Sequence, residues 1–223
     1  MYWISTTERV KLNYAMTTVA AIVVYTFFVQ FVPQKLWLSV LFFIVGECLK
    51  VFIVQKLYKL DTTNNMEGVL KRRRNNKVME SLKFGFVMSL TVFFFAFICI
   101  ILGAPALEKY LETFTLSALL TGITLFPISL FIGVSGTISI LMTESFDLSN
   151  VTAQAFLKLL KRNAYLVIFG AFIGSVVFPL DWDRPWQIYP IPNIVGAVTG
   201  QMLGSFYCLV ETMVKHKLGK KQH

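Results

Sequence analysis

The chain has 223 residues, 56% of them apolar, with a mean hydropathy of +0.65 and a formal net charge of +9. This is more apolar surface than a soluble core needs, and no connection between apolar runs is long enough for a separate soluble domain. The three cysteines lie in or beside apolar runs without metal-ligand spacing, which argues against a disulfide framework and against a zinc site.

Six apolar runs follow one another along the chain, and each is about long enough to cross a hydrocarbon layer about 30 Å thick. A membrane span must satisfy its backbone hydrogen bonds internally, so each run is predicted to be a helix. We therefore expect an all-α fold: one polytopic membrane domain, residues 1–223, built as a bundle of six transmembrane helices. The spans are expected at about 14–33, 36–55, 84–104, 114–134, 164–180 and 193–212.

The second predicted span carries two charges. Glu47 and Lys50 are three residues apart and share a helix face. Intramembrane charges can indicate a transporter or a proton relay, so a small lipid or solute transporter is one alternative. The simpler interpretation is an ion pair, with Lys50 reaching toward the interface. The two halves of the chain show no convincing internal repeat of the kind that many transporters contain.

The distribution of Lys and Arg predicts the orientation. With the N-terminus inside, seventeen of these residues fall on the cytosolic side, eight of them in the basic loop 56–83, against three on the far side. The positive-inside rule then places both termini in the cytosol. The run "KRRRNNK", 71–77, resembles a nuclear signal or an anionic-lipid patch, but its role in topology already explains it, and we expect no nucleic-acid partner. A glycan on the sequon at Asn150 would contradict this orientation.

The connection "GAPALEKYLET" after the third span is predicted to lie on the lumenal side. Gly103 suits a helix C-cap, and Pro105 suits the first turn of the next helix. Glu108 and Glu112 would then share one face near a helix N-terminus, which favours negative charge. We favour capping and partner contact over acid–base chemistry here. The candidate recognition residues are Gly103, Ala104, Pro105, Glu108, Glu112 and Thr113.

The fourth, fifth and sixth spans carry packing signals. Pro127 is predicted to kink the fourth span, which neighbouring helices can accommodate. Glycines spaced four residues apart lie along one face of the fifth span and one face of the sixth, where they allow helix backbones to approach closely. These faces either pack on each other or bind another membrane subunit, and the first is favoured. The glycines are Gly170, Gly174, Gly196, Gly200 and Gly204.

The stretch "PLDWDRPWQIYPIP", 179–192, concentrates polar, aromatic and proline residues between the last two spans. Its prolines enforce an extended path, and its aromatic residues favour the membrane–water interface. Its two aspartates and its arginine either form ion pairs within the loop or meet a charged partner. The candidate recognition residues are Asp181, Trp182, Asp183, Arg184, Trp186 and Gln187.

The tail "KKQH" places Lys220 and Lys221 at the fourth-last and third-last positions. A cytosolic lysine pair at these positions is typical of the dilysine signal for retrieval to the endoplasmic reticulum. A positively charged cytosolic flank is the alternative interpretation. We expect a multi-pass protein of the endoplasmic reticulum membrane.

The lumenal side offers four carboxylates but no histidine, since His216 and His223 both fall in the cytosolic tail. A zinc site needs His or Cys ligands, and a nucleophile needs a base within reach. We therefore expect no catalytic, cofactor-binding or metal-binding residues. The alternative is a lipid head-group transferase that acts alone, using Glu108, Glu112, Asp181 and Asp183.

The two lumenal stretches resemble the PIG-F family of glycosylphosphatidylinositol (GPI) anchor biosynthesis. "GAP" followed by "LET" carries part of the resemblance, and "PLDWDRPWQIYPIP" fits the long pattern D-W-[DE]-R-x-W-Q-x-[WY]-P-I. The similarity is strong from about Leu102 onward. The matching residues are Gly103, Ala104, Pro105, Leu111, Glu112, Thr113, Asp181, Trp182, Asp183, Arg184, Trp186, Gln187, Tyr189, Pro190 and Ile191.

The resemblance implies a non-catalytic stabilising subunit in the endoplasmic reticulum membrane. Its expected partners are the large multi-span transferases that move ethanolamine phosphate from phosphatidylethanolamine onto mannoses of the GPI precursor, and these partners carry the catalytic site. Membrane lipids are also expected partners, and the GPI precursor is a further candidate. No cofactor is implied for this chain.

Overall fold

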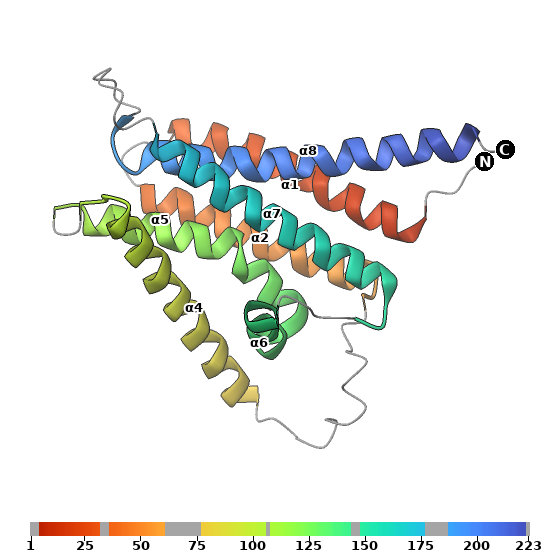
Figure 1. The fold of residues 1–223 in the computed structure, drawn as a ribbon, viewed down its shortest axis with the longest axis horizontal. Coiled ribbons are helices and arrows are strands. Elements are labelled where there is room, and N and C mark those ends of the chain that lie inside the picture. Colours follow the sequence, from red (N-terminus) through yellow and green to blue (C-terminus); the bar gives the residue numbers. More distant parts are fainter. Residues whose placement is uncertain are drawn as a thin grey trace.

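The computed structural model describes residues 5–31, 36–60, 77–105, 108–143, 148–176 and 187–221. These residues form seven α-helices and confirm the all-α prediction for the part of the chain they cover (Figure 1). The helices are α1 (Thr6–Phe31), α2 (Leu36–Leu57), α4 (Lys77–Ile101), α5 (Tyr110–Ile123), α6 (Leu125–Thr143), α7 (Val151–Ser175) and α8 (Ile191–Lys221).

Helix α8 packs along α7 and also contacts α1 and α5 (Figure 1). Helix α2 packs against α1, α5 and α6 on the far side of α1. Helix α4 leans away from this group and packs against α5 and α6 alone among the described helices. The result is a bundle with one splayed helix, and α1 begins at the same end of the bundle where α8 ends (Figure 1).

Three of the described helices are long and apolar enough to cross a membrane. The stretches are Met79–Ile101 in α4, Leu125–Met142 in α6 and Ile191–Val214 in α8. Large apolar side chains cover the outside of the bundle, and on α4 they include Phe86, Phe93 and Phe97, each 60% or more exposed. Surrounding hydrocarbon would cover such a surface. The predicted number of six spans and the cytosolic termini stay predictions.

The fourth predicted span, 114–134, is divided between two helices. Helix α5 ends at Ile123 and α6 begins at Leu125, so the break lies at Thr124 and not at Pro127. Pro127 falls in the first turn of α6, where backbone N–H groups lack an intrahelical partner and proline is tolerated. The prediction of a kink at Pro127 was wrong for this reason. A second irregularity lies at Gly133, whose φ of 78° is left-handed.

Helix α7 begins well before the predicted fifth span. Asn150 caps it, because its Oδ1 accepts hydrogen bonds from the backbone N–H groups of Thr152 at 2.9 Å and Ala153 at 3.4 Å. Capping of this kind satisfies donors that the first turn leaves without partners. The helix therefore includes the basic residues Lys158, Lys161 and Arg162 within its first twelve residues.

Helices α7 and α8 are in backbone contact along their glycines. A Cβ atom added at Gly170 would lie 2.2 Å from the carbonyl oxygen of Gly196, and one added at Gly200 would lie 2.1 Å from that of Leu166. Gly174 faces Pro192 and Gly204 faces Asn163 at comparably short distances. Only a residue without a Cβ allows this approach, which brings many backbone atoms into dispersion contact. The two glycine faces thus meet each other.

Candidate recognition site

The turn after α4 has the hydrogen bonds of a Schellman motif, as predicted for Gly103. The N–H of Ala104 donates to the carbonyl of Cys99 at 2.9 Å, and the N–H of Gly103 donates to that of Ile100 at 3.0 Å. Gly103 has a φ of +99°, which a residue with a Cβ adopts only under strain. The glycine therefore fixes the direction in which Ala104 and Pro105 leave the helix.

The next helix begins later than the sequence indicated. Helix α5 starts at Tyr110, after a non-helical Lys109 with φ −128° and ψ 43°. Pro105 therefore lies outside its first turn. Glu112 is in that first turn, where the helix dipole favours a carboxylate, whereas Glu108 precedes the helix. The prediction that Glu108 and Glu112 share a helix face was wrong, because the turn uses more residues than expected.

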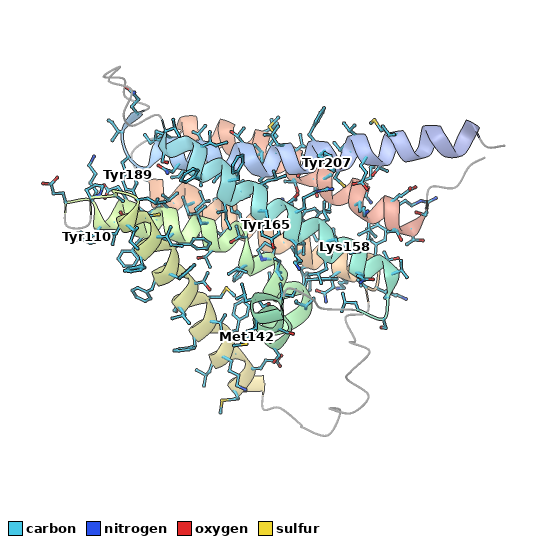
Figure 2. The ribbon with its side chains drawn as sticks, in the orientation of Figure 1. Tyr110, Met142, Lys158, Tyr165, Tyr189 and Tyr207 are labelled. Carbon is cyan, nitrogen blue, oxygen red and sulfur yellow. The ribbon has the colours of Figure 1, made fainter. Side chains whose placement is uncertain are left out.

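A hydrogen bond joins the two connections that the sequence singled out. The hydroxyl of Tyr189 donates to Oγ1 of Thr113 at 3.0 Å, across 76 residues of sequence. Thr113 is buried, and its own hydroxyl donates to the carbonyl of Lys109 at 3.1 Å. Burial raises the pKa of Tyr189 to about 12, so the phenol stays protonated and able to donate at neutral pH. Figure 2 shows Tyr110 and Tyr189 together at one end of the molecule.

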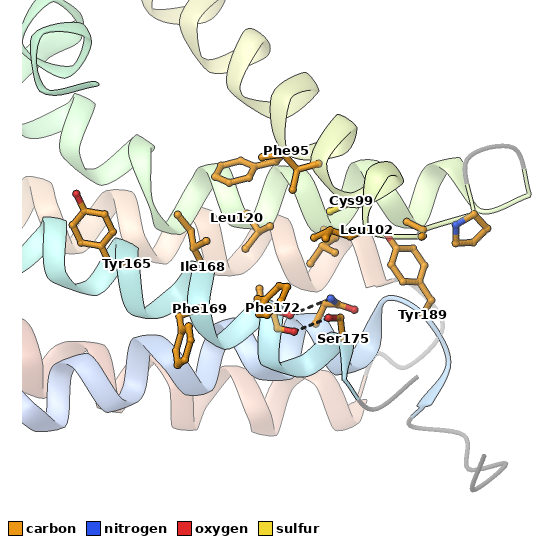
Figure 3. A pocket seen from close by; sticks show the side chains of 17 residues that line it. Phe95, Cys99, Leu102, Leu120, Tyr165, Ile168, Phe169, Phe172, Ser175 and Tyr189 are labelled. Carbon is orange, nitrogen blue, oxygen red and sulfur yellow. Dashed lines mark hydrogen bonds between the residues drawn. The ribbon is translucent and has the colours of Figure 1, made fainter. Parts of the chain in front are cut away.

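The structure describes only part of the candidate site. Asp181, Trp182, Asp183, Arg184 and Trp186 lie outside the described residues, while Gln187 is described and half-buried. Gly103, Ala104, Pro105, Glu108, Glu112 and Thr113 are all described. Among these, Gly103, Ala104 and Pro105 line a cavity together with Tyr189 (Figure 3).

This cavity has a volume of about 620 Å³ and includes residues that the sequence did not single out. Asn193 and Ser175 supply polar atoms to its lining. The Nδ2 of Asn193 donates to the carbonyl of Ala171 at 3.1 Å, but its Oδ1 is buried and has no hydrogen-bond partner among the described residues. One sequence signal could have pointed to Asn193: its polar side chain stands at the start of an apolar span, directly after the last proline of the loop.

A second polar cluster lies in the middle of the bundle. Oε1 of Glu47 lies 2.5 Å from Nζ of Lys50 and accepts a hydrogen bond from Nε2 of Gln201 at 2.8 Å. Lys50 also donates to Oγ1 of Thr18 at 3.1 Å, and the hydroxyl of Tyr14 donates to Oε2 of Glu47 at 3.4 Å. The sequence suggested that Lys50 reaches toward the interface, but this prediction was wrong. Lys50 is buried in a network that joins α1, α2 and α8.

The described side chains of both clusters form hydrogen bonds with one another. Within the described ranges, no three His, Cys, Asp or Glu side chains come together in a way that could hold a metal ion. The carboxylate of Glu47 is already used by an ammonium, an amide and a phenol. Lys220 and Lys221 form the end of α8. What the geometry offers is a set of ordered polar turns at one end of a helical bundle.

These features define a helical protein with membrane-type surfaces. The chain belongs to the PIG-F family: the model of the GPI biosynthesis protein family Pig-F matches residues 12–209. The human protein named GPI ethanolamine phosphate transferase, stabilizing subunit, is 30% identical over 143 residues, which cover 58% of this chain and 58% of the human one.

Fungal relatives match as well. The glycosylphosphatidylinositol anchor biosynthesis protein 11 of Debaryomyces hansenii is 29% identical over 155 residues, covering 69% of this chain and 64% of the relative. The protein of that name in Candida glabrata is 49% identical over 47 residues, covering 21% of this chain and 22% of the relative. The chain thus spans about 58% of the length of its human relative. No solved structure matches it.

Proposed function

We propose that this chain is a non-catalytic stabilising subunit of a GPI ethanolamine phosphate transferase. The observation that carries the proposal is membership of the PIG-F family over residues 12–209, together with a human relative whose name is that of the stabilising subunit. In this function the chain supports the addition of ethanolamine phosphate to mannoses of the GPI precursor. The partner is a large multi-span transferase that carries the catalytic site.

The proposed setting is the endoplasmic reticulum membrane, crossed six times with both termini in the cytosol. The excess of Lys and Arg in the segments assigned to the cytosol supports this orientation. The start of α1 and the end of α8 lie at the same end of the bundle, as an even number of crossings requires (Figure 1). The Thr113–Tyr189 end would then face the lumen.

The proposed contact with the transferase uses two features. The hydrogen bond between Tyr189 and Thr113 holds the two lumenal connections together at one end of the bundle. The preceding stretch 181–187 supplies Trp182, Trp186 and Arg184, which are of the types enriched where proteins bind each other. Ordering of the flanking turns lowers the entropic cost of presenting this stretch to a partner.

Affinity purification from detergent tests the proposal. We expect a much larger transferase to co-purify with the chain, and its level to fall when the chain is depleted. Trp182→Ala and Arg184→Ala should weaken co-purification while leaving the chain itself folded. Lys158→Ala is the control, because Lys158 is exposed and lies toward the opposite end from Tyr189 (Figure 2).

Two outcomes would contradict the proposal. The first is an unchanged level of the transferase after depletion. The second is transfer of ethanolamine phosphate between lipids by the purified chain alone in liposomes, which would make the chain an enzyme in its own right. Normal co-purification of both loop variants would remove the role assigned to the stretch 181–187.

A further inference from the structure

The cavity beside the Gly103 turn is a groove between two helices that diverge. Helix α4 forms one wall and α7 the other, while Leu116 and Leu120 of α5 form the floor (Figure 3). Because α4 packs on α5 and α6 while α7 packs mainly on α8, their facing sides are not in contact. The groove follows from the splayed position of α4.

The lining is apolar along most of its length and polar toward one end. Phe95, Ile168 and Phe172 contribute apolar walls, and Ser175 and Tyr189 lie toward the end where Leu102 is (Figure 3). Asn193 also lines the cavity and bonds to Ala171, one turn before Ser175 on α7. Tyr165 lies at the opposite end of the groove (Figure 3). The buried Oδ1 of Asn193 lacks a hydrogen-bond partner among the described residues. Water at the interface or a residue outside the described ranges has to supply that donor, because an acyl chain and its ester groups cannot donate.

The length of the groove matches one leaflet of a bilayer. Tyr165 and Ser175 are ten residues apart on α7, which is about 15 Å at about 1.5 Å per residue. Half of a hydrocarbon core about 30 Å thick is also about 15 Å. Gly200 packs on Leu166, so the Tyr165 end lies beside the middle of the apolar stretch Ile191–Val214. The groove therefore runs from the interface to the centre of the hydrocarbon.

The volume of the groove is large enough for a hydrocarbon chain. At about 30 Å³ per water-sized group, 620 Å³ holds roughly twenty such groups, which is room for one acyl chain of common length.

We propose that this groove binds one acyl chain of a membrane phospholipid, taken from the leaflet on the Tyr189 side. The chain end lies near Tyr165 and the polar end lies near Asn193. The walls outside the groove carry exposed apolar side chains such as Phe97 and Ile173, so the medium next to the opening is itself hydrocarbon. This inference goes beyond the proposed function and does not depend on the transferase.

Photolabelling of the full chain in lipid nanodiscs tests the proposal. The probe is phosphatidylcholine that carries a diazirine near the end of one acyl chain, and labelled residues are identified by mass spectrometry. We expect labels to concentrate around Tyr165 and Ile168 in the groove rather than to spread evenly over exposed residues such as Phe93. Ile168→Trp narrows the groove and should lower this labelling by about threefold or more, equivalent to about 0.7 kcal/mol.

The control variant is Ile173→Trp, on the same helix. Ile173 is 51% exposed and Ile168 is 42% exposed, but only Ile168 lines the groove. Neither substitution disturbs a buried position, and a symmetrical size-exclusion peak verifies folding. Phe172→Ala widens the groove and should keep or increase the labelling. Even labelling of all exposed apolar residues, or an equal fall in both tryptophan variants, would overturn the proposal.

Discussion

The substitution Glu47→Leu should cost this bundle a large part of its stability. Glu47 is 1% exposed, and its Oε1 receives both the ammonium of Lys50 at 2.5 Å and the amide of Gln201 at 2.8 Å. Without the carboxylate, Lys50 stays buried as a cation with only the hydroxyl of Thr18 as a hydrogen-bond partner in this network. Breaking a buried ion pair by removing one partner costs about 3–5 kcal/mol.

Further substitutions should restore stability in steps. Glu47→Leu combined with Lys50→Met removes the uncompensated charge, but it leaves both polar atoms of Gln201 buried without partners, since Oε1 of Gln201 already has none among the described residues. A buried unsatisfied group costs about 1–3 kcal/mol. Adding Gln201→Leu removes that group as well, and well-packed apolar replacement of a buried pair is often neutral. We expect the triple variant to be the most stable of the three, the double variant to be intermediate and Glu47→Leu alone to be the least stable.

Thermal unfolding in one detergent, followed by size-exclusion chromatography, measures this order. A change of 1 kcal/mol shifts Tm by about 2–4 °C for a chain of this size, so Glu47→Leu alone should lower Tm by about 6–20 °C. Lys158→Met is the control, because an exposed charge contributes within about 0.5 kcal/mol. A single variant as stable as the triple variant would refute the reasoning, since it would mean that Lys50 is not held away from water.

Three further substitutions probe the packing and the turns by the same measurement of Tm. Gly200→Ala places a Cβ 2.1 Å from the carbonyl oxygen of Leu166 and should cost about 1–3 kcal/mol of stability. Its control is Gly85→Ala, which meets no atom within 4 Å and should stabilise α4 by up to about 1 kcal/mol. Equal Tm values for the two variants would contradict the backbone contact. Tyr189→Phe removes the hydrogen bond to Thr113 and should cost about 0.5–1.5 kcal/mol of stability. Tyr110 is exposed, so Tyr110→Phe should change Tm little. A larger fall in Tm for Tyr110→Phe than for Tyr189→Phe would argue against the role of the Tyr189–Thr113 hydrogen bond. Gly103→Ala should cost about 1–2 kcal/mol because of its φ of +99°, with Gly46→Ala in open space as its control.

The sequence predicted those features that depend on local chemistry. Gly103 ends α4 as its type and position indicated, because only glycine adopts a φ of +99° without strain. The helices of the described residues followed from the need of apolar runs to satisfy their own backbone hydrogen bonds. These predictions required no knowledge of how distant segments meet.

Features that depend on distant segments were not predictable in the same way. The hydrogen bond between Tyr189 and Thr113 joins residues 76 positions apart, and nothing in either stretch specifies the other as its partner. The groove depends on the angle at which α4 leaves α5, which small differences in side-chain packing decide. The break at Thr124 was not predicted, because a proline inside an apolar run itself indicates a kink. Proline is well tolerated near a helix start, so Pro127 instead lies just after the break.

The contact between Gln201 and Glu47 has a consequence for the order of assembly during synthesis. Chains emerge from the ribosome N-terminal end first, and α8 is the last of the described helices to appear. Until it does, the carboxylate on α2 lacks its amide partner and the glycine face of α7 has no helix against it. A nascent chain that stalls before α8 would display both defects at once, and both are features by which quality control can tell an unfinished chain from a finished one.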